Sequence, residues 1–532
     1  MRAATVGLVP RRLLRTVVPL AAVAVVLSGC TFAAAEPQTT APPPAHLDAA
    51  LERLPDRIGE LLDETGVPGL SVAVVHDGEV VFADGYGVAD LDSGAKVDAD
   101  TVFQLASVSK SVGATVISAL IGKTEGLTWQ TPVTSQLPWF ALGDEWVTRH
   151  LELGDLYSHR SGLPDHAGDD LASFGVDQRT VLERLRHLPL APFRDHYAYT
   201  NFGIQAGAMT AASAAGGDWM DLSREVLYEP LGMERTTSRY ADYVAMDNRA
   251  VGHTKWDGAW RVTPEQLDDD VATAAGGVAS SADDMAIFLR LLLDGGRHEG
   301  RALVDEAALA EAMSAQMLIP SHPADVAVPK GAYGRGFQIG VVTGTGDTLV
   351  SHSGAFAQGA GTIISTVPAM GLGVVVLTNG YPIGLAETVS METIDWAVHG
   401  SLSRDWWKAF SDAFAEVTAP FPSKVIDDPP ASAAPAGPAA DYLGAYRSDY
   451  FGEATVRETG DHLELTIRPT PDTGQTWRLE PYDGDVFRVL LDNEDATPDS
   501  VSAVEFDPAR GTFTFEFFDH SSGGAGTFTR TP

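Results

Sequence analysis

A proline- and alanine-rich segment divides this chain into two regions with different hydrophobic patterns. Residues 418–440 read TAPFPSKVIDDPPASAAPAGPAA, a composition typical of a linker. Before this segment, helix-like and strand-like patterns are mixed. After it, apolar residues alternate with polar ones, which is typical of β-strands. We therefore predict two folded regions, residues 46–417 and 441–532, joined by the linker at 418–440.

The first region has strand-like runs near both of its ends and helix-like runs in between. Asp77-Gly78 is a strong hairpin signal between two of the strand-like runs, and Gly66 and Pro68 are typical of a helix end. The expected strands are residues 70–75, 79–86, 362–365 and 372–377, and the expected helices are residues 46–64, 107–120 and 385–398. This arrangement favours an α+β fold whose antiparallel sheet is assembled from both ends of the region.

The second region is predicted to be a small all-β domain. Two runs alternate between apolar and polar positions: Leu463, Leu465 and Ile467, and Phe513, Phe515 and Phe517. Short strands of this kind, separated by turn signals such as Gly460-Asp461, are typical of a barrel or a sandwich. No catalytic pattern occurs in residues 441–532, so we expect the chemistry to lie in the first region.

Composition excludes some partners and sites. The formal net charge is −36, and a surface of that sign repels phosphate backbones, so we expect no nucleic-acid partner. The only cysteine is Cys30, which rules out a disulfide or a cysteine-based zinc site within one chain. We predict that the protein uses neither a metal nor an organic cofactor.

The first thirty residues have the pattern of an export signal. Four arginines precede an apolar run at residues 17–27: Arg2, Arg11, Arg12 and Arg15. The run is too short for a membrane-spanning helix, which needs about 20 apolar residues. It ends in Leu27-Ser28-Gly29-Cys30, which resembles a bacterial lipobox, in which the cysteine becomes the lipidated first residue of the mature protein. The alternative is an ordinary secretory signal.

We therefore predict a lipoprotein signal peptide at residues 1–30, lipidation at Cys30 and a flexible tether at residues 31–45. The tether is rich in Ala, Thr and Pro and cannot build a core. The expected location is outside the cytoplasm, with the lipid holding the protein to a bacterial membrane.

Ser107 and Lys110 are the first candidates for catalysis. They are three residues apart in FQLASVSKS, at the expected start of a helix, and this spacing places both side chains on one face within hydrogen-bond reach. A serine hydroxyl needs a base to become a good nucleophile, and a lysine can serve if its pKa is depressed. Ser109 points elsewhere on the helix, so Ser107 is the expected nucleophile. On its own, this pattern also fits a polar helix end with a solvated lysine.

Two further motifs follow in the chain. Residues 197–203 read YAYTNFG and contain Tyr199 and Asn201, and residues 351–355 read SHSGA and contain His352 and Gly354. S-x-x-K, Y-x-N and H-x-G in this order resemble the serine β-lactamase and DD-peptidase superfamily, in the branch of class C β-lactamases, DD-carboxypeptidases, D-aminopeptidases and related esterases. Further stretches that resemble this branch include LYSHRSGLP at 156–164, AGGVASSADDM at 275–285 and YGRGF at 333–337.

The resemblance covers roughly residues 50–400 and implies a β-lactamase/transpeptidase-like fold, an antiparallel sheet flanked by helices. The tail, with YLGAYRSDYFGEATV at 442–456, is similar to the lipocalin-like β-domain that follows the catalytic domain in some serine peptidases of this branch.

The resemblance also implies catalytic roles. Ser107 would attack the substrate carbonyl and form an acyl-enzyme, Lys110 would take and relay the proton, and Tyr199 would assist proton transfer to the leaving group. The backbone N–H groups of Ser107 and Ala355 would form the oxyanion hole.

Four more residues are expected to bind substrate. Asn201 would hydrogen-bond the substrate's amide side chain. His352, where many relatives have lysine, would orient Tyr199 or a substrate carboxylate. Ser353 lies beside it, and Gly354 would let the substrate backbone lie against the strand edge without a clash. HAGDD at 166–170 has no accompanying metal motif, so we expect a loop near the mouth of the site.

These features predict a serine hydrolase that transfers an acyl group from a peptide, amide or ester to water. Two alternatives stay open: a true β-lactamase, and a penicillin-binding sensor or binding protein with little turnover. Because position 352 is histidine and not lysine, we expect better turnover of peptides, amides or esters than of penicillins. The sequence does not predict an oligomeric state.

Overall fold

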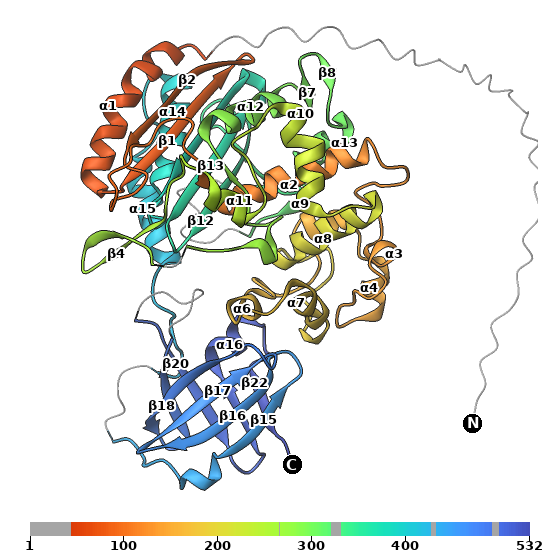
Figure 1. Cartoon of the computed structure of the whole chain (residues 1–532), viewed down its shortest axis with the longest axis vertical. Helices are drawn as coiled ribbons and strands as arrows, with labels where there is room; N and C mark the ends of the chain where they lie inside the picture. Colours follow the sequence, from red (N-terminus) through yellow and green to blue (C-terminus); the bar gives the residue numbers. More distant parts are fainter. Residues whose placement is uncertain (1–43, 265, 321–330, 427–431, 492–498) are drawn as a thin grey trace, which may run out of the picture. The chain divides into compact units, whose positions relative to one another are not determined.

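The structure is a computed structural model of the chain that describes residues 44–264, 266–320, 331–426, 432–491 and 499–532. Residues Ala41–Pro532 form one compact unit. It contains an α+β domain and a closed β-barrel (Figure 1), as the sequence predicts. The predicted signal peptide, Cys30 and most of the predicted tether lie outside the described residues.

An eight-stranded antiparallel sheet forms the centre of the α+β domain, in the order β2-β1-β14-β13-β12-β11-β10-β9. The strands are β1 (Gly69–His76), β2 (Glu79–Gly87), β9 (Met317–Leu318), β10 (Ala332–Tyr333), β11 (Gln338–Val341), β12 (Thr348–Phe356), β13 (Ala360–Val367) and β14 (Leu372–Thr378). The first strands pair with the last ones, since Leu70 lies opposite Thr378. The turn between β1 and β2 has positive φ at Asp77 (49°) and Gly78 (80°), as a two-residue hairpin requires.

Helices cover both faces of this sheet. On one face, α1 (Leu47–Thr65), α14 (Leu385–His399) and α15 (Trp406–Val417) bury side chains such as Ile58 and Ile394 in one cluster with Val72. On the other face, α12 (Ala282–Leu293) buries Leu289 in a second cluster with Val375. Because both faces are covered, β1 and β14 are apolar along nearly their whole length.

The middle of the domain is a mostly helical region, as expected. Its helices are α2 (Ser109–Ile121), α3 (Val133–Gln136), α4 (Glu145–His150), α5 (Leu153–Tyr157), α6 (Asp169–Ser173), α7 (Gln178–Arg184), α8 (Asn201–Ala215), α9 (Trp219–Ser223), α10 (Glu229–Leu231), α11 (Tyr240–Ala245) and α13 (Glu306–Ala312). Small two-stranded sheets accompany them: β3 (Phe103–Gln104) with β6 (Ala279–Ser280), β4 (His253–Trp256) with β5 (Ala259–Val262), and β7 (Arg297–His298) with β8 (Arg301–Ala302).

The second domain is a closed antiparallel barrel of eight strands. They are β15 (Gly444–Ser448), β16 (Gly452–Thr459), β17 (His462–Arg468), β18 (Gln475–Asp483), β19 (Val486–Leu490), β20 (Val501–Asp507), β21 (Thr512–Phe515) and β22 (Thr527–Arg530). Aromatic side chains fill its interior: the ring of Phe506, for example, lies 5.0 Å from Tyr442 and 5.3 Å from Phe513. The predicted alternation holds at Phe513 and Phe515, but Phe517 lies in a helix, α16 (Glu516–Ser521), and not in a strand.

The predicted linker is only partly a spacer. Its Phe421 packs edge-on against Phe517 at 5.2 Å, and the Phe421 N–H donates to Ser500 Oγ. The first residues of the linker are therefore part of the barrel's packing, because an aromatic side chain gains more from burial than from solvent. Residues 427–431 of the linker lie outside the described residues.

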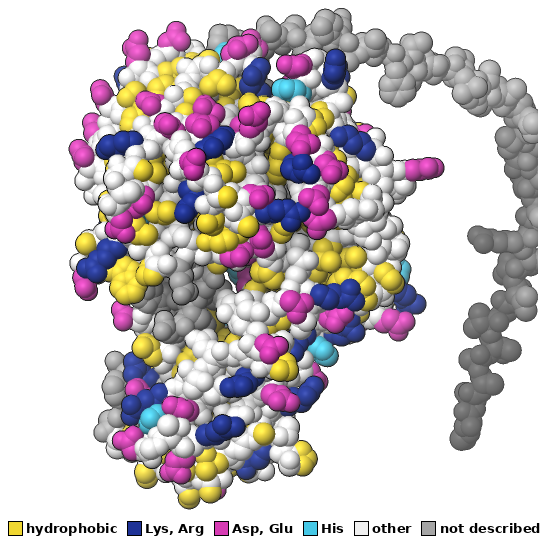
Figure 2. All heavy atoms as spheres, viewed as in Figure 1, with side chains coloured by type: hydrophobic (Ala, Val, Ile, Leu, Met, Phe, Trp, Pro, Cys, Tyr) yellow, Lys and Arg dark blue, Asp and Glu magenta, His cyan; other side chains and the backbone are white. Residues whose placement is uncertain are grey.

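The face of the molecule in Figure 2 carries Asp and Glu side chains interspersed with Lys and Arg, which agrees with the acidic composition. Within the described residues, no helix is both long and apolar enough to cross a membrane.

Candidate active site

Ser107 lies where a short 3₁₀ turn (η1, Ala106–Val108) leads into α2. The preceding residue, Ala106, has a φ of 46°, a left-handed conformation that is strained for a residue with a side chain. Ser107 is half-buried, while Ser109 is fully buried and its Oγ accepts the N–H of Val278 at 3.0 Å. Of these two serines, Ser107 is therefore the one accessible to a substrate.

Lys110 is fully buried and makes three hydrogen bonds from its Nζ. The acceptors are Ser107 Oγ at 2.9 Å, Asn201 Oδ1 at 2.7 Å and the carbonyl oxygen of Ala275 at 3.0 Å. Burial lowers the pKa of Lys110 to about 7, although the carboxylates of Asp169 and Asp269 oppose this shift. At neutral pH a lysine with this pKa is partly in its neutral form, and the neutral form can act as a base.

Tyr199 stands on the other side of the nucleophile. Its hydroxyl donates to Ser107 Oγ at 2.8 Å, and the Lys110 Nζ lies 4.5 Å from the centre of its ring. Burial raises the pKa of Tyr199 far above its ordinary value, so the side chain is a neutral phenol that can donate a proton. Ser107 Oγ thus receives hydrogen bonds from both Lys110 and Tyr199.

Asn201 is the first residue of α8, and both ends of its amide are engaged within the protein. Its Oδ1 accepts from Lys110, and its Nδ2 donates to Asp169 Oδ2 at 2.9 Å. The same Asp169 oxygen lies 2.9 Å from His166 Nδ1. The structure therefore shows Asn201 holding Lys110, and the substrate contact expected from the sequence stays a prediction. HAGDD lies beside the site, since the His166 ring is 5.7 Å from that of Tyr199.

His352 lies on β12 and is buried. Its Nε2 lies 2.8 Å from the hydroxyl of Tyr333, and its Nδ1 lies 2.7 Å from the carbonyl oxygen of Ser353. A carbonyl oxygen only accepts, so Nδ1 carries a hydrogen. The structure thus adds Tyr333 as a partner of His352, and the expected role of His352 toward Tyr199 or a substrate carboxylate stays a prediction.

The next two residues, Ser353 and Gly354, make contacts within the protein. The hydroxyl of Ser353 donates to the buried carboxylate of Glu387 on α14. A Cβ at Gly354 would collide with the carbonyl oxygen of Leu105 and lie close to Ser107 N. The glycine therefore lets β12 approach the turn that carries Ser107, and the substrate clearance expected from the sequence stays a prediction.

The far end of β12 forms an open edge next to the nucleophile. Strand β11 pairs with β12 only as far as Ser351, so in the described part of the chain His352–Phe356 has no strand partner on that side. Ala355 is exposed on this edge. Its backbone is therefore accessible to a substrate that lies beside Ser107.

His159 is a buried residue of the site that the sequence analysis did not select, although it lies in the LYSHRSGLP stretch. Its Nδ1 accepts the N–H of Thr200 at 3.1 Å, and its ring centre lies 4.5 Å from that of Tyr199 and 4.6 Å from that of Tyr333. Burial lowers the pKa of His159 well below its ordinary value, so the ring is neutral. His159 therefore packs against the ring of Tyr199.

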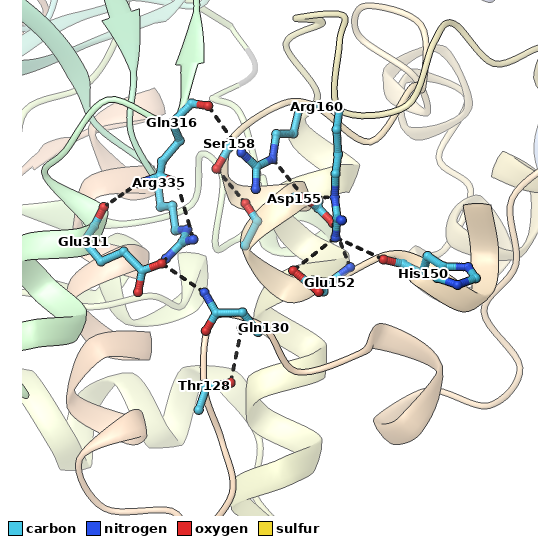
Figure 3. A network of polar contacts seen from close by, with 12 residues as sticks. Thr128, Gln130, His150, Glu152, Asp155, Ser158, Arg160, Glu311, Gln316 and Arg335 are labelled. Atoms are coloured by element: carbon cyan, nitrogen blue, oxygen red, sulfur yellow. Dashed lines mark hydrogen bonds and ion pairs between the residues drawn. The ribbon is translucent and has the colours of Figure 1, made fainter. Parts of the chain in front are cut away.

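A buried ion-pair network holds the loop that carries His159. Asp155 on α5 has no exposed surface and accepts from Arg160 Nε at 2.8 Å and from Arg194 at 2.7 and 2.9 Å. Figure 3 shows Arg160 directed toward Asp155. On the other side of the network, Arg335 pairs with Glu311 at 2.6 Å. The network braces the helical region behind the site.

The geometry defines a class of protein. A half-buried serine hydroxyl contacts both a buried lysine of lowered pKa and a tyrosine hydroxyl, beside an open strand edge. This arrangement suits nucleophilic catalysis with lysine as the base. Among the described residues, no group of three or more His, Cys, Asp or Glu is placed to hold a metal ion.

The sequence comparison gives the family. Residues 54–388 match the family described as Beta-lactamase, so the chain belongs to the Beta-lactamase family of serine hydrolases. Residues 428–526, which include strands β15 to β21 of the barrel, match a family described as a domain of unknown function (DUF3471).

Curated relatives and solved structures agree with this assignment. The unguisins hydrolase ungD of Aspergillus violaceofuscus is 28% identical over 439 residues, which cover 76% of each chain. The D-aminopeptidase of Brucella anthropi is 27% identical over 244 residues, which cover 42% of this chain and 45% of that one. The octameric penicillin-binding protein homologue of Pyrococcus abyssi superposes with a TM-score of 0.56 at 20% identity, over 87% of this chain and 98% of that one, which confirms the fold.

Proposed function

We propose that this protein hydrolyses peptide, amide or ester bonds through an acyl-enzyme on Ser107. The observation that carries the proposal is the position of Ser107 Oγ, within 2.9 Å of Lys110 Nζ and 2.8 Å of the Tyr199 hydroxyl. The comparisons support a hydrolase of this family and leave the substrate open.

The hydrogen bonds of Lys110 explain how it acts as a base. Asn201 Oδ1 and the carbonyl oxygen of Ala275 can only accept, so they retain the two N–H groups of a neutral lysine. The lone pair of Nζ then faces Ser107 Oγ. Lys110 takes the hydroxyl proton as Oγ forms a bond to the substrate carbonyl carbon, and the backbone N–H groups of Ser107 and Ala355 are proposed to stabilise the oxyanion.

The leaving group departs with a proton from Tyr199, and Lys110 returns its proton to Tyr199. Both groups contact the same atom, since Ser107 Oγ lies 2.9 Å from Lys110 Nζ and 2.8 Å from the Tyr199 hydroxyl. Water then attacks the ester carbon, its proton is taken by the same pair, and Ser107 Oγ is released and protonated. Each cycle consumes one water and leaves the protein unchanged.

We propose peptides, amides or esters as substrates, in preference to penicillins. Both ring nitrogens of His352 are engaged within the protein, by Tyr333 and by the carbonyl oxygen of Ser353. A lysine at this position would offer a fixed positive charge to a substrate carboxylate, and histidine engaged in this way offers less. The alternatives are a true β-lactamase and a penicillin-binding sensor with little turnover.

The test is covalent labelling of the full chain with a fluorophosphonate and with a fluorescent penicillin, followed by peptide mapping. A panel of D-amino-acid peptides, amides, esters and β-lactams is assayed in parallel. Label on Ser107 with turnover of at least one peptide, amide or ester supports the proposal. Stable labelling without turnover of any substrate would favour the sensor.

We also propose that the protein is exported and lipid-anchored through Cys30, on the basis of the lipobox-like sequence alone. Metabolic labelling with a fatty-acid analogue tests this. Incorporation into the wild-type chain and its loss in Cys30→Ser are the expected results, and an unlabelled wild-type chain would leave an ordinary secretory signal.

A further inference from the structure

The barrel contacts a segment that lines the active site. We call residues 164–174 the bridging segment; it includes α6. The hydroxyl of Tyr450, in the turn between β15 and β16, accepts the N–H of Gly168 at 3.0 Å. Ser521, the last residue of α16, donates from Oγ to Asp170 Oδ2 at 2.6 Å. Two polar contacts from the barrel therefore flank Asp169.

Apolar contacts accompany these hydrogen bonds. The ring of Phe174, at the end of the bridging segment, lies 5.6 Å from Phe518 and 6.1 Å from Trp477 of the barrel. Tyr450 itself is buried, with 1% of its surface exposed. The barrel therefore holds the bridging segment by burial as well as by hydrogen bonds, and the contact excludes water.

The opposite side of the bridging segment contacts the catalytic residues. Asp169 accepts from Asn201 Nδ2 at 2.9 Å, and Asp165 accepts the N–H of Tyr199 at 2.6 Å. Gly168 has a φ of 102°, and a Cβ there would collide with Phe202, the neighbour of Asn201. The backbone at Gly168 is thus clamped between the barrel and the start of α8.

The contact with Asp169 decides how Asn201 faces Lys110. A carboxylate only accepts hydrogen bonds, so the Asn201 amide nitrogen must face Asp169 and its oxygen must face Lys110. If the amide turned over, its N–H₂ would point at the lysine, and the lone pair of neutral Lys110 could then be taken up by Asn201 and not by Ser107. The position of Asp169 therefore affects the ability of Lys110 to accept the Ser107 proton.

We propose that the C-terminal barrel positions the catalytic base: Tyr450 and Ser521 hold the bridging segment so that Asp169 orients Asn201 against Lys110. This inference rests on the proposed function, and it gives the barrel a role in catalysis without placing any of its residues at the reacting atoms. Tyr450 and Ser521 are positioning residues.

The pH dependence of Ser107 labelling distinguishes a positioning role of the barrel from a general loss of stability. The charged and titratable groups that face Lys110 are Asp169, Asp269, Tyr199 and His159. The carboxylate of Asp169 raises the pKa of Lys110, so a looser bridging segment leaves that pKa lower. The labelling rate of Ser107 then begins to fall at a lower pH than in the wild type, while its maximal value is also lower.

The experiment uses the full chain and the rate of fluorophosphonate labelling of Ser107, measured from pH 5 to 9. The test variant is Tyr450→Phe with Ser521→Ala. The matched control is Tyr446→Phe with Ser522→Ala, because the Tyr446 hydroxyl bonds to the Tyr442 carbonyl and Ser522 Oγ bonds to the Phe518 carbonyl, both inside the barrel. Thermal unfolding of both variants reports the loss of barrel stability.

We expect the test variant to label roughly ten- to a hundredfold more slowly, as a misplaced catalytic group does, with its acidic limb moved to lower pH. The control should label within about twofold of wild type with an unmoved profile. Equal slowing of both variants, or an unchanged rate and profile in the test variant, would overturn the inference while Ser107 still labels in the wild type. A wild-type chain that does not label at Ser107 would instead refute the proposed function, and this inference with it.

Discussion

Lys110 Nζ lies 2.9 Å from Ser107 Oγ, and the other two hydrogen bonds of Nζ go to oxygen atoms that only accept. This arrangement leaves one direction for the lone pair of a neutral lysine, toward the serine hydroxyl. Burial, which lowers the pKa of Lys110 to about 7, makes the neutral form available near neutral pH. The first predictions concern these two residues.

Ser107→Ala is expected to abolish turnover and covalent labelling, with a loss on the order of 10⁶ in kcat, because no nucleophile remains. Ser109→Ala is the matched control: Ser109 Oγ accepts a backbone N–H inside the fold and faces away from the substrate. Its labelling should persist at Ser107. Labelling lost in Ser109→Ala but kept in Ser107→Ala would reverse the assignment.

Lys110→Arg is expected to lower kcat/KM by about 10²–10⁴-fold at pH 7 and above, since arginine keeps its proton, and the difference from wild type should narrow below pH 7. In the wild-type protein kcat/KM should fall about tenfold per pH unit below about 7, because the base must be neutral and its lowered pKa is about 7. Ionisation of Tyr199 should not lower kcat/KM at any pH up to 10, since the pKa of Tyr199 is raised above its ordinary value.

Steady-state rates of both proteins between pH 5 and 10 check this. If wild-type kcat/KM already falls below about pH 10, where an ordinary lysine titrates, then Lys110 is not buried as the structure shows. Activity of Lys110→Arg above a few per cent of wild type would mean that another group is the base.

The sequence was sufficient for most of the fold, because local patterns specified it. The Asp77-Gly78 hairpin, the apolar runs of β13 and β14 and the period-two strands of the barrel each depend on short stretches of chain. Phe517 was wrongly placed because an alternating run continues in sequence beyond the end of β21, where the chain turns into α16.

The partners of the site residues were harder to predict, since they are tertiary contacts. Asp169 and His159 act on Asn201 and Tyr199 from 32 and 40 residues away in the chain, and no spacing rule connects them. His352 was expected to orient Tyr199 or a substrate carboxylate, and the sequence did not indicate its contact with Tyr333, which lies on β10 of the same sheet. The sequence motifs identified the site residues. Their contacts with one another depend on how α6, α8 and β12 pack together in the fold.

Asp155→Ala is expected to destabilise the α+β domain by about 3 kcal/mol. The reason is that Arg160 and Arg194 would lose their shared buried carboxylate, which has no exposed surface. Asp412→Asn is the control, because its ion pair with Lys408 is exposed to solvent and contributes little to stability. Urea unfolding followed by tryptophan fluorescence measures both variants. A cost for Asp155→Ala no larger than that of Asp412→Asn would show that the network in Figure 3 does not stabilise the domain.

The last prediction concerns the substrate. Within the protein, His352 Nδ1 donates to a carbonyl oxygen and Nε2 contacts the Tyr333 hydroxyl, so the ring has no N–H directed by these contacts at a substrate carboxylate. We therefore expect kcat/KM for the best peptide, amide or ester to exceed that for every penicillin in the panel, with slow deacylation after any penicillin acylation. His352→Lys introduces a fixed positive charge and should narrow this gap by improving KM for penicillins more than kcat. His352→Gln, which restores no charge, is the control and should not narrow it. A wild-type preference for penicillins, or an equal gain for both variants, would show that the residue at position 352 does not set substrate class.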